Sequence, residues 1–349
     1  MATTRLHSKK QNPLSKQTDN VRTVAGFLIS AFFLWLTFRA IDFSGFKIIP
    51  HTQSLLFLFA AMLVLLFSVW LQSLRMKLFW SKPPPSSPTV STLPSLILGN
   101  LYNSIIPGNL GEAIKAWHLS RKNNLPFGNT IAALITEKWL DAHLFLFLSV
   151  LYFLYQPFQP HFIHYSVATV AFMVLGLSVV YSLMKKIKWV EKKIWSIALL
   201  YKKIGIPLFR TYLQVGYFQK HLRQQKTLLR FVLIGIGVFT LNVLQYYLLF
   251  KAVALHLPIA NVSSAYLISL SMVVIIAIPS APGNIGVLHY GVYASLLFAA
   301  HNLGIAPNTA LLQTFVLYTI YLHCSCFIPE VIIGLVVLLK ERNTLFQNR

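Results

Sequence analysis

Two short phrases that break helices recur about half the chain length apart, each inside apolar surroundings. The first is Pro-Gly-Asn-Leu-Gly-Glu and the second is Pro-Gly-Asn-Ile-Gly-Val. A helix that starts after such a break points free N–H groups and the positive end of its dipole into the interior, where they suit an anion such as phosphate. The candidate binding residues in the two phrases are Pro107, Gly108, Asn109, Gly111 and Glu112, and Pro282, Gly283, Asn284, Gly286 and His289.

Charged residues close to the phrases extend this candidate site. Lys115 and Arg121 lie further along the helix expected after the first phrase. Glu137 and Asp141 are four residues apart and share a helix face, and Lys138 is placed to pair with Asp141. Ionisable residues at membrane depth are costly and indicate function, but a structural cluster that caps a span explains Glu137 and Asp141 equally well, so both interpretations stay open.

A further acidic residue, Glu330, follows Pro329 in the last apolar segment. It falls nearer the end of its segment, so the argument from membrane depth is weaker there. We include it among the candidate substrate-binding residues.

Composition fixes the class of protein. The chain has 349 residues, of which 56% are hydrophobic and only 11% charged, against a usual charged share of roughly a quarter. Apolar runs close to the length that spans a bilayer as a helix recur at 24–41, 55–74, 144–155, 167–184, 231–250 and 311–339. The sequence therefore predicts an all-α, polytopic helical membrane protein.

Basic residues set the expected topology, because positive clusters favour the cytoplasmic side. All clusters fall on that side if the chain forms six full spans plus two re-entrant hairpins, at 93–120 and 266–300, that enter from opposite faces as an inverted repeat. Both termini are then cytoplasmic. Eight full spans are the alternative, and they fit the charges less well.

The domain boundaries follow from this topology. A basic tail at 1–21, with no cleavable signal, precedes one membrane domain at 22–340, and a short tail at 341–349 follows. The domain divides into a first half at 22–184, basic interfacial helices at 185–226 and a second half at 227–340.

The net charge of +22 does not indicate nucleic-acid binding, because the charges flank the spans and suit anionic lipid headgroups. Cys324 and Cys326 lie in the last apolar segment beside His323, where packing explains them better than a metal site. We expect no metal and no cofactor.

The first phrase with Lys115, followed by Ile-Thr-Glu-Lys-Trp-Leu-Asp, resembles the lysylphosphatidylglycerol synthase transmembrane, flippase-like family, and so does the second phrase. Members typically show Pro-x-x-x-Gly-Glu and then Glu-Arg-x-x-Asp. Two positions depart from this pattern: Lys138 replaces the Arg and loses its bidentate fork, and His289 stands where many members carry an acid. Full-length synthases continue into an aminoacyltransferase domain, whereas this chain ends at Arg349, so the expected activity is lipid translocation without aminoacyl transfer.

The resemblance implies a lipid flippase of the cell membrane. Its partner would be an anionic phospholipid or a polyprenyl-phosphate lipid, with the headgroup held between the two hairpins. A homo-oligomer or an envelope-synthesis enzyme as a protein partner stays open. The alternatives are a membrane-embedded transferase that acts on lipid-linked sugar or polyprenyl phosphate, and a non-catalytic partner of a cell-envelope synthase.

Overall fold

The computed structural model describes residues 13–39, 52–80, 90–106, 110–155, 192–193, 195–196, 202–222, 225–253, 258–278 and 280–346. Every regular element in these residues is a helix, which confirms the all-α class. The long elements are α1 (Pro13–Phe38), α2 (Thr52–Lys77), α5 (Phe127–Tyr155), α8 (Lys202–Leu222), α9 (Gln225–Ala252) and α12 (Thr309–Phe346). The shorter ones are η1 (Leu78–Trp80), α3 (Leu93–Ile105), α4 (Gly111–Lys122), α10 (Val262–Ala277), η2 (Pro282–Asn284) and α11 (Val287–Asn302).

Three helices in the described residues are long and apolar enough to cross a membrane, at Thr52–Trp80, Lys226–Ala252 and Thr309–Arg342. Shorter apolar helices occur at Gly26–Phe38 and Val262–Ala277. The protein is therefore a polytopic helical membrane protein, as predicted. The expected span at 167–184, and the parts of the expected tails at 1–12 and 347–349, lie outside the described residues, whereas α1 begins at Pro13 within the stretch assigned to the first tail.

Both helix-breaking phrases interrupt a helix, as their composition predicts. At the first, α3 ends at Ile105 and Ile106 is extended, with φ −114° and ψ 131°, because a residue before proline is pushed out of the helical region. The chain becomes helical again at Gly111. Pro107, Gly108 and Asn109 themselves lie outside the described residues.

The second phrase shows why its residue types are needed. Gly283 and Asn284 both have left-handed backbones, with φ of 69° and 55°, and Gly286 has φ of 88°. Glycine adopts this region freely, and asparagine tolerates it better than most side chains. The residues of the Pro-Gly-Asn-x-Gly phrase thus permit the tight turn that reverses the chain between α10 and α11.

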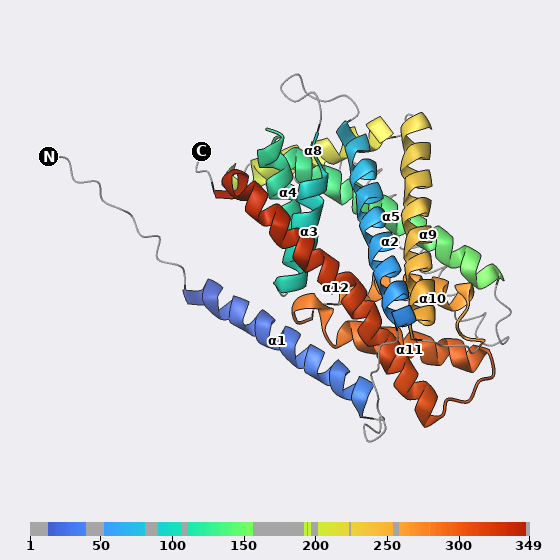
Figure 1. Ribbon diagram of the computed structural model, residues 1–349. Helices are drawn as coiled ribbons and strands as arrows, with labels where there is room; N and C mark the ends of the chain where they lie inside the picture. Colours follow the sequence, from blue (N-terminus) through green and yellow to red (C-terminus); the bar gives the residue numbers. More distant parts are fainter. Residues whose placement is uncertain are drawn as a thin grey trace.

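Figure 1 shows the two broken helices at opposite ends of the long helices. The carboxyl ends of α2 and α12 and the amino end of α9 gather with α4 at the top of the view, whereas α10 and α11 lie at the bottom. From the top, α3 descends toward the η2 turn, and its last carbonyls reach it: a Cβ built on Gly283 would lie 3.5 Å from the carbonyl oxygen of Ser104. The two breaks therefore meet in the middle of the molecule.

Two apolar clusters hold these ends. The larger joins α9, α10, α11 and α12 around buried residues such as Phe250, Phe315 and Tyr318. The other joins the end of α2, η1, α4, α5, α8 and α9, where the Phe79 ring meets the rings of Phe218 and Phe231 edge-on. The second hairpin is held in the larger cluster and α4 in the other, while α3 packs with α4 and α12 in a third, small cluster.

Helix α1 packs on the second hairpin. The hydroxyl of Ser30 accepts the backbone N–H of Ala281 at 2.8 Å. A Cβ on Gly286 would lie 2.2 Å from the Ser30 carbonyl oxygen, so only glycine fits there without movement. The second phrase thus serves as a packing surface as well as a turn.

Candidate functional site: a charged cavity where the hairpins meet

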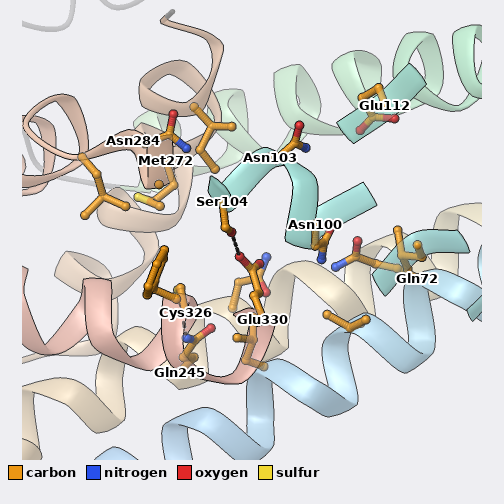
Figure 2. A pocket seen from close by; sticks show the side chains of 18 of the residues that line it. Gln72, Asn100, Asn103, Ser104, Glu112, Gln245, Met272, Asn284, Cys326 and Glu330 are labelled. Carbon is orange, nitrogen blue, oxygen red and sulfur yellow. Dashed lines mark hydrogen bonds between the residues drawn. The ribbon is translucent and has the colours of Figure 1, made fainter. Parts of the chain in front are cut away.

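A cavity of about 300 Å³ lies where the two broken helices meet. Its walls come from α2, α3, α4, α5, α9, α10, η2, α11 and α12. Figure 2 shows the polar side chains that line it, with Asn103 and Asn284 near the hairpin tips and Glu330 reaching toward Ser104. Polar groups from distant parts of the sequence thus converge on one site inside the helical bundle.

Eight of the predicted site residues line this cavity: Glu112, Lys115, Glu137, Lys138, Asp141, Gly283, Asn284 and Glu330. Others lie elsewhere. Arg121 has its guanidinium 5.0 Å from the centre of the Trp117 ring, away from the cavity lining. Gly111 packs against Gly99 of α3, and Gly286 packs against α1. Pro282 is also not among the lining residues, and Pro107, Gly108 and Asn109 lie outside the described residues.

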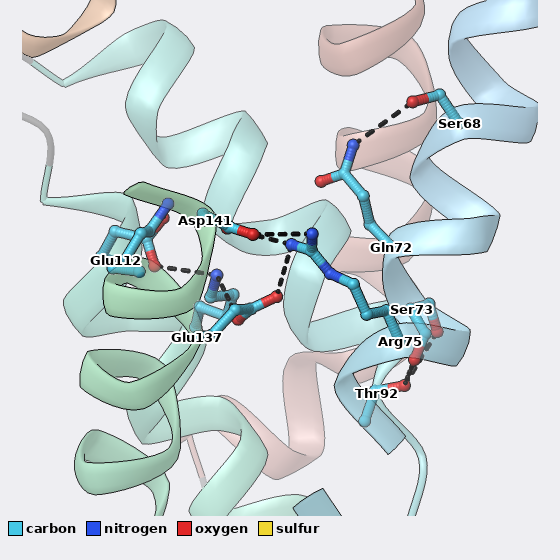
Figure 3. A network of polar contacts seen from close by, with 10 residues as sticks. Ser68, Gln72, Ser73, Arg75, Thr92, Glu112, Glu137 and Asp141 are labelled. Atoms are coloured by element: carbon cyan, nitrogen blue, oxygen red, sulfur yellow. Dashed lines mark hydrogen bonds and ion pairs between the residues drawn. The ribbon is translucent and has the colours of Figure 1, made fainter. Parts of the chain in front are cut away.

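An ion-pair network forms one wall of the cavity (Figure 3). Arg75 of α2 bonds the two acidic residues of α5, at 3.1 Å from Glu137 and 2.7 Å from Asp141. Lys115 lies 2.8 Å from Glu112 and 3.9 Å from Glu137. Three cations, Arg75, Lys115 and Lys138, therefore face three carboxylates, and the wall is close to neutral as a whole.

The partner predicted for Lys138 was wrong. Its ammonium lies 3.0 Å from Glu112 of α4 rather than on Asp141. Asp141 is held by Arg75 instead. The i, i+3 spacing permits the pair that the sequence suggested, but α4 offers Glu112 to Lys138, and α2 offers the Arg75 guanidinium to Asp141.

The two helix starts are less open to an anion than the sequence suggests. The N–H of Gly111 donates to the side-chain oxygen of Asn103 at 2.7 Å. The N–H of Gly286 faces Nδ1 of His289 at 3.4 Å. Glu112 also places a carboxylate in the first turn of α4. The expectation that these N–H groups are free is thus wrong for Gly111 and Gly286.

A hydrogen bond beside the cavity connects α3 to α12. The Ser104 hydroxyl donates to Glu330 at 2.7 Å. His289 does not line the cavity, but its ring stacks on that of His323, which does, with centroids 5.0 Å apart. The side-chain amide of Gln245 reaches Ser325 and Cys326 on α12. Within the described residues, no group of three or more His, Cys, Asp and Glu residues is arranged to hold a metal ion.

Sequence reasoning missed several lining residues, and Arg75 is the most important. On α2 it continues a polar stripe with Ser68 and Gln72, at helical spacing within an apolar span. Pairs three residues apart do the same on other helices: Asn100 with Asn103, and Asn242 with Gln245. Polar stripes of this kind are the signal that would have found them.

An apolar groove adjoins the cavity. It has a volume of about 190 Å³ and is lined mainly by Leu66, Trp70, Leu93, Ile97, Pro329 and Ile333, from α2, α3 and α12. Four residues line both spaces: Leu65, Val69, Asn100 and Glu330. The polar cavity and the apolar groove are therefore neighbouring parts of one surface.

The fold and the site together define a polytopic helical membrane protein with a polar cavity between two broken helices. A family model described as the lysylphosphatidylglycerol synthase TM region matches residues 23–322. The chain belongs to this family, which points to a membrane protein that acts on lipids. Searches among curated proteins and solved structures found no match for the chain.

Proposed function

We propose that the protein moves a lipid across the membrane, with the headgroup in the central cavity and a hydrocarbon chain in the apolar groove. The supporting observation is the shared boundary between the two spaces, formed by Leu65, Val69, Asn100 and Glu330. A ligand that occupies both must be polar at one end and apolar at the other. A membrane lipid has that chemistry, and the family membership agrees with it.

The hairpins would supply the movement. The second hairpin packs in the larger apolar cluster and α4 of the first packs in the other, and the hairpin tips meet beside the cavity. In alternating access, one hairpin shifts against the other around a binding site that stays in place. The re-entrant topology of the two hairpins belongs to this proposal, as does the cytoplasmic position of both termini.

The charged wall would orient the headgroup. A phosphate that approaches Lys115 must replace Glu112, 2.8 Å away, and a cationic group that approaches Asp141 must compete with Arg75. Exchange of partners inside a paired network costs less than exposure of a bare buried charge. The network can therefore bind a headgroup and release it again without a large energy barrier to either step.

The test is a flipping assay in proteoliposomes, with a phospholipid labelled on its headgroup and a membrane-impermeant quencher outside. The variant Leu65→Trp fills the boundary between cavity and groove. The matched control is Leu63→Trp on the same helix, where the side chain is 51% exposed and lines neither space. We expect the wild type and Leu63→Trp to move lipid and Leu65→Trp to be slowed at least tenfold.

Two results would contradict the proposal. One is a wild-type protein that neither binds nor moves any lipid in the panel. The other is a chemically altered lipid product, detected by mass spectrometry, without movement of the unaltered lipid. The second outcome would support a membrane-embedded transferase in place of a flippase.

A further inference from the structure

Six carboxamide side chains line the central cavity. They are Gln72, Asn100, Asn103, Asn242, Gln245 and Asn284, and they come from α2, α3, α9 and η2. Figure 2 labels Gln72, Asn100, Asn103, Gln245 and Asn284 on different sides of the space, with Asn103 and Asn284 near the hairpin tips. Figure 3 shows Gln72 beside the ion pairs, but a carboxamide carries no charge to pair, so these neutral groups need an explanation of their own.

Internal bonds use only part of the hydrogen-bonding capacity of these groups. A carboxamide offers two donor hydrogens and an acceptor oxygen with two lone pairs. The oxygens of Asn103, Asn242 and Asn284 accept from Gly111, Ser68 and Ser280, which leaves their NH₂ groups available.

The remaining groups provide acceptors. The NH₂ groups of Gln72 and Gln245 donate to Ser68 and Ser325, which leaves their oxygens available. Within the described part of the chain, Asn100 makes no hydrogen bond and presents both kinds of group. Gln245 is only 1% exposed and nevertheless lines the cavity, so a donor that enters the cavity can bond its oxygen.

The charges of the cavity argue against a net charge on the part of the ligand that meets these amides. Arg75, Lys115 and Lys138 are each within 3.1 Å of a carboxylate. A charged ligand group must break or share one of these pairs, whereas an uncharged group needs no such exchange. The ligand group that binds these carboxamides with the least disruption of the ion pairs is neutral and rich in both hydrogen-bond donors and acceptors.

Hydroxyl groups have that property, because each donates one hydrogen bond and accepts others. Neighbouring hydroxyls on a sugar or polyol match the paired donor and acceptor of a carboxamide. The cavity volume of about 300 Å³ is about ten times the share of one water molecule in the liquid. That space is large enough for one small headgroup unit.

We infer that the carboxamide side of the cavity binds an uncharged, hydroxyl-rich unit of a lipid headgroup, a single sugar or a glycerol-type polyol. This inference rests on the proposed function for the lipid itself, and it adds the chemical class of the headgroup. The polyol occupies the space between Asn100, Asn103 and Asn284, and the hydrocarbon chain leaves past Asn100 into the apolar groove.

The experiment compares lipids that share the same acyl chains and differ only in the headgroup. Purified protein in micelles is incubated with phosphatidylglycerol, a monoglucosyl diacylglycerol, phosphatidylethanolamine or phosphatidic acid, and retention is measured by native mass spectrometry. We expect the first two lipids to bind at least threefold more tightly than the last two. Preference for the glucosyl lipid over phosphatidylglycerol assigns the unit as a sugar, and the reverse preference assigns it as glycerol.

The variant Asn100→Leu removes a carboxamide and keeps a similar volume. Because Asn100 has no internal hydrogen bond in the described residues, the change breaks no hydrogen bond among them. Loss of one or two hydrogen bonds predicts a roughly 3- to 10-fold weaker binding of the hydroxylated lipids, with little change for phosphatidylethanolamine. The control is Asn302→Leu at the end of α11, which lies away from the cavity.

The wild-type panel alone can overturn the inference. If phosphatidylethanolamine binds as tightly as the hydroxylated lipids while lipid is still moved in proteoliposomes, the headgroup class is wrong and the proposed function survives. If Asn100→Leu, folded as judged by a single size-exclusion peak, keeps the full preference, the carboxamide assignment is wrong. If the wild type binds none of the four lipids, both the inference and the proposed function fail.

Discussion

Removal of Arg75 should destabilise the protein far more than removal of an exposed arginine. The Arg75 side chain is 7% exposed and bonds Glu137, also 7% exposed, and Asp141, which is one-third exposed. In Arg75→Met, Glu137 would keep a single cationic neighbour, Lys115, at 3.9 Å. Three carboxylates of the wall would then face two cations.

The magnitude follows from this geometry. Removal of one partner from a buried ion pair costs about 3–5 kcal/mol, because the other charge is left buried and poorly compensated. The bond to Asp141 adds less, since solvent screening limits partly exposed pairs to about 1 kcal/mol or below. We expect a total loss of about 3–5 kcal/mol for Arg75→Met. The guanidinium carbon also lies 4.8 Å from the centre of the Phe231 ring, and methionine is chosen because its flexible apolar side chain can pack against an aromatic ring.

The assay is reversible unfolding in mixed micelles, titrated with a denaturing detergent and followed by tryptophan fluorescence. The double variant Arg75→Met/Glu137→Gln removes the uncompensated charge together with its partner. It should be more stable than Arg75→Met alone by at least about 1 kcal/mol, the coupling expected for contacting residues. Arg121→Met, over Trp117 and away from the cavity lining, serves as the control and should lose less than about 1 kcal/mol.

Two outcomes would refute the reasoning. The first is an Arg75→Met variant that loses no more stability than Arg121→Met, which would mean that water solvates the charged wall freely. The second is a double variant no more stable than Arg75→Met, which would mean that the loss comes from packing and not from the orphaned carboxylate.

Two further predictions concern the hairpins, both measured by the same titration. Gly304→Ala should lower the free energy of unfolding by about 1–2 kcal/mol from its left-handed backbone alone. Gly286→Ala should lower it at least twice as much, because its Cβ would also lie 2.2 Å from the Ser30 carbonyl oxygen. Equal losses for the two variants would argue against close packing of α1 on the second hairpin. Ser104→Ala should lower the free energy of unfolding by about 1–3 kcal/mol through loss of its hydrogen bond to Glu330. The control Ser271→Ala removes only a hydrogen bond within α10 and should lower it by less than about 1 kcal/mol. A Ser104→Ala variant as stable as Ser271→Ala would show that Ser104 does not connect α3 to α12.

Much of the fold could be read from local patterns. Apolar runs located the helices at 52–77, 225–252 and 309–346, because length and hydropathy are properties of a single segment. The Pro-Gly-Asn-x-Gly words located both breaks, because proline and left-handed glycine act on their immediate neighbours. The acidic candidates Glu112, Glu137, Asp141 and Glu330 were found through the rarity of acidic residues at membrane depth, and they do line the cavity.

The errors concern partners across helices. The sequence paired Lys138 with Asp141 on the same helix, but the structure gives Lys138 to Glu112 and Asp141 to Arg75. It also left the N–H of Gly111 open to a ligand, although Asn103 on the facing half-helix occupies it. Arg75 was not among the candidate residues, although it holds both Glu137 and Asp141. In each case the deciding contact joins residues whose distance along the chain carries no information about their distance in space.

The sequence by itself determined the membrane class, the helix positions and the two breaks, because these depend on hydropathy and backbone preferences over a few residues. Only the tertiary structure decided that the breaks meet, that three cations and three carboxylates neutralise one another, and that carboxamides from four elements face one cavity beside an apolar groove. Those features depend on the packing of α3 against η2 and of α2 against α9, and on the reach of Arg75 from α2 to α5. Packing between segments sets which charges pair and which polar groups stay free for a ligand.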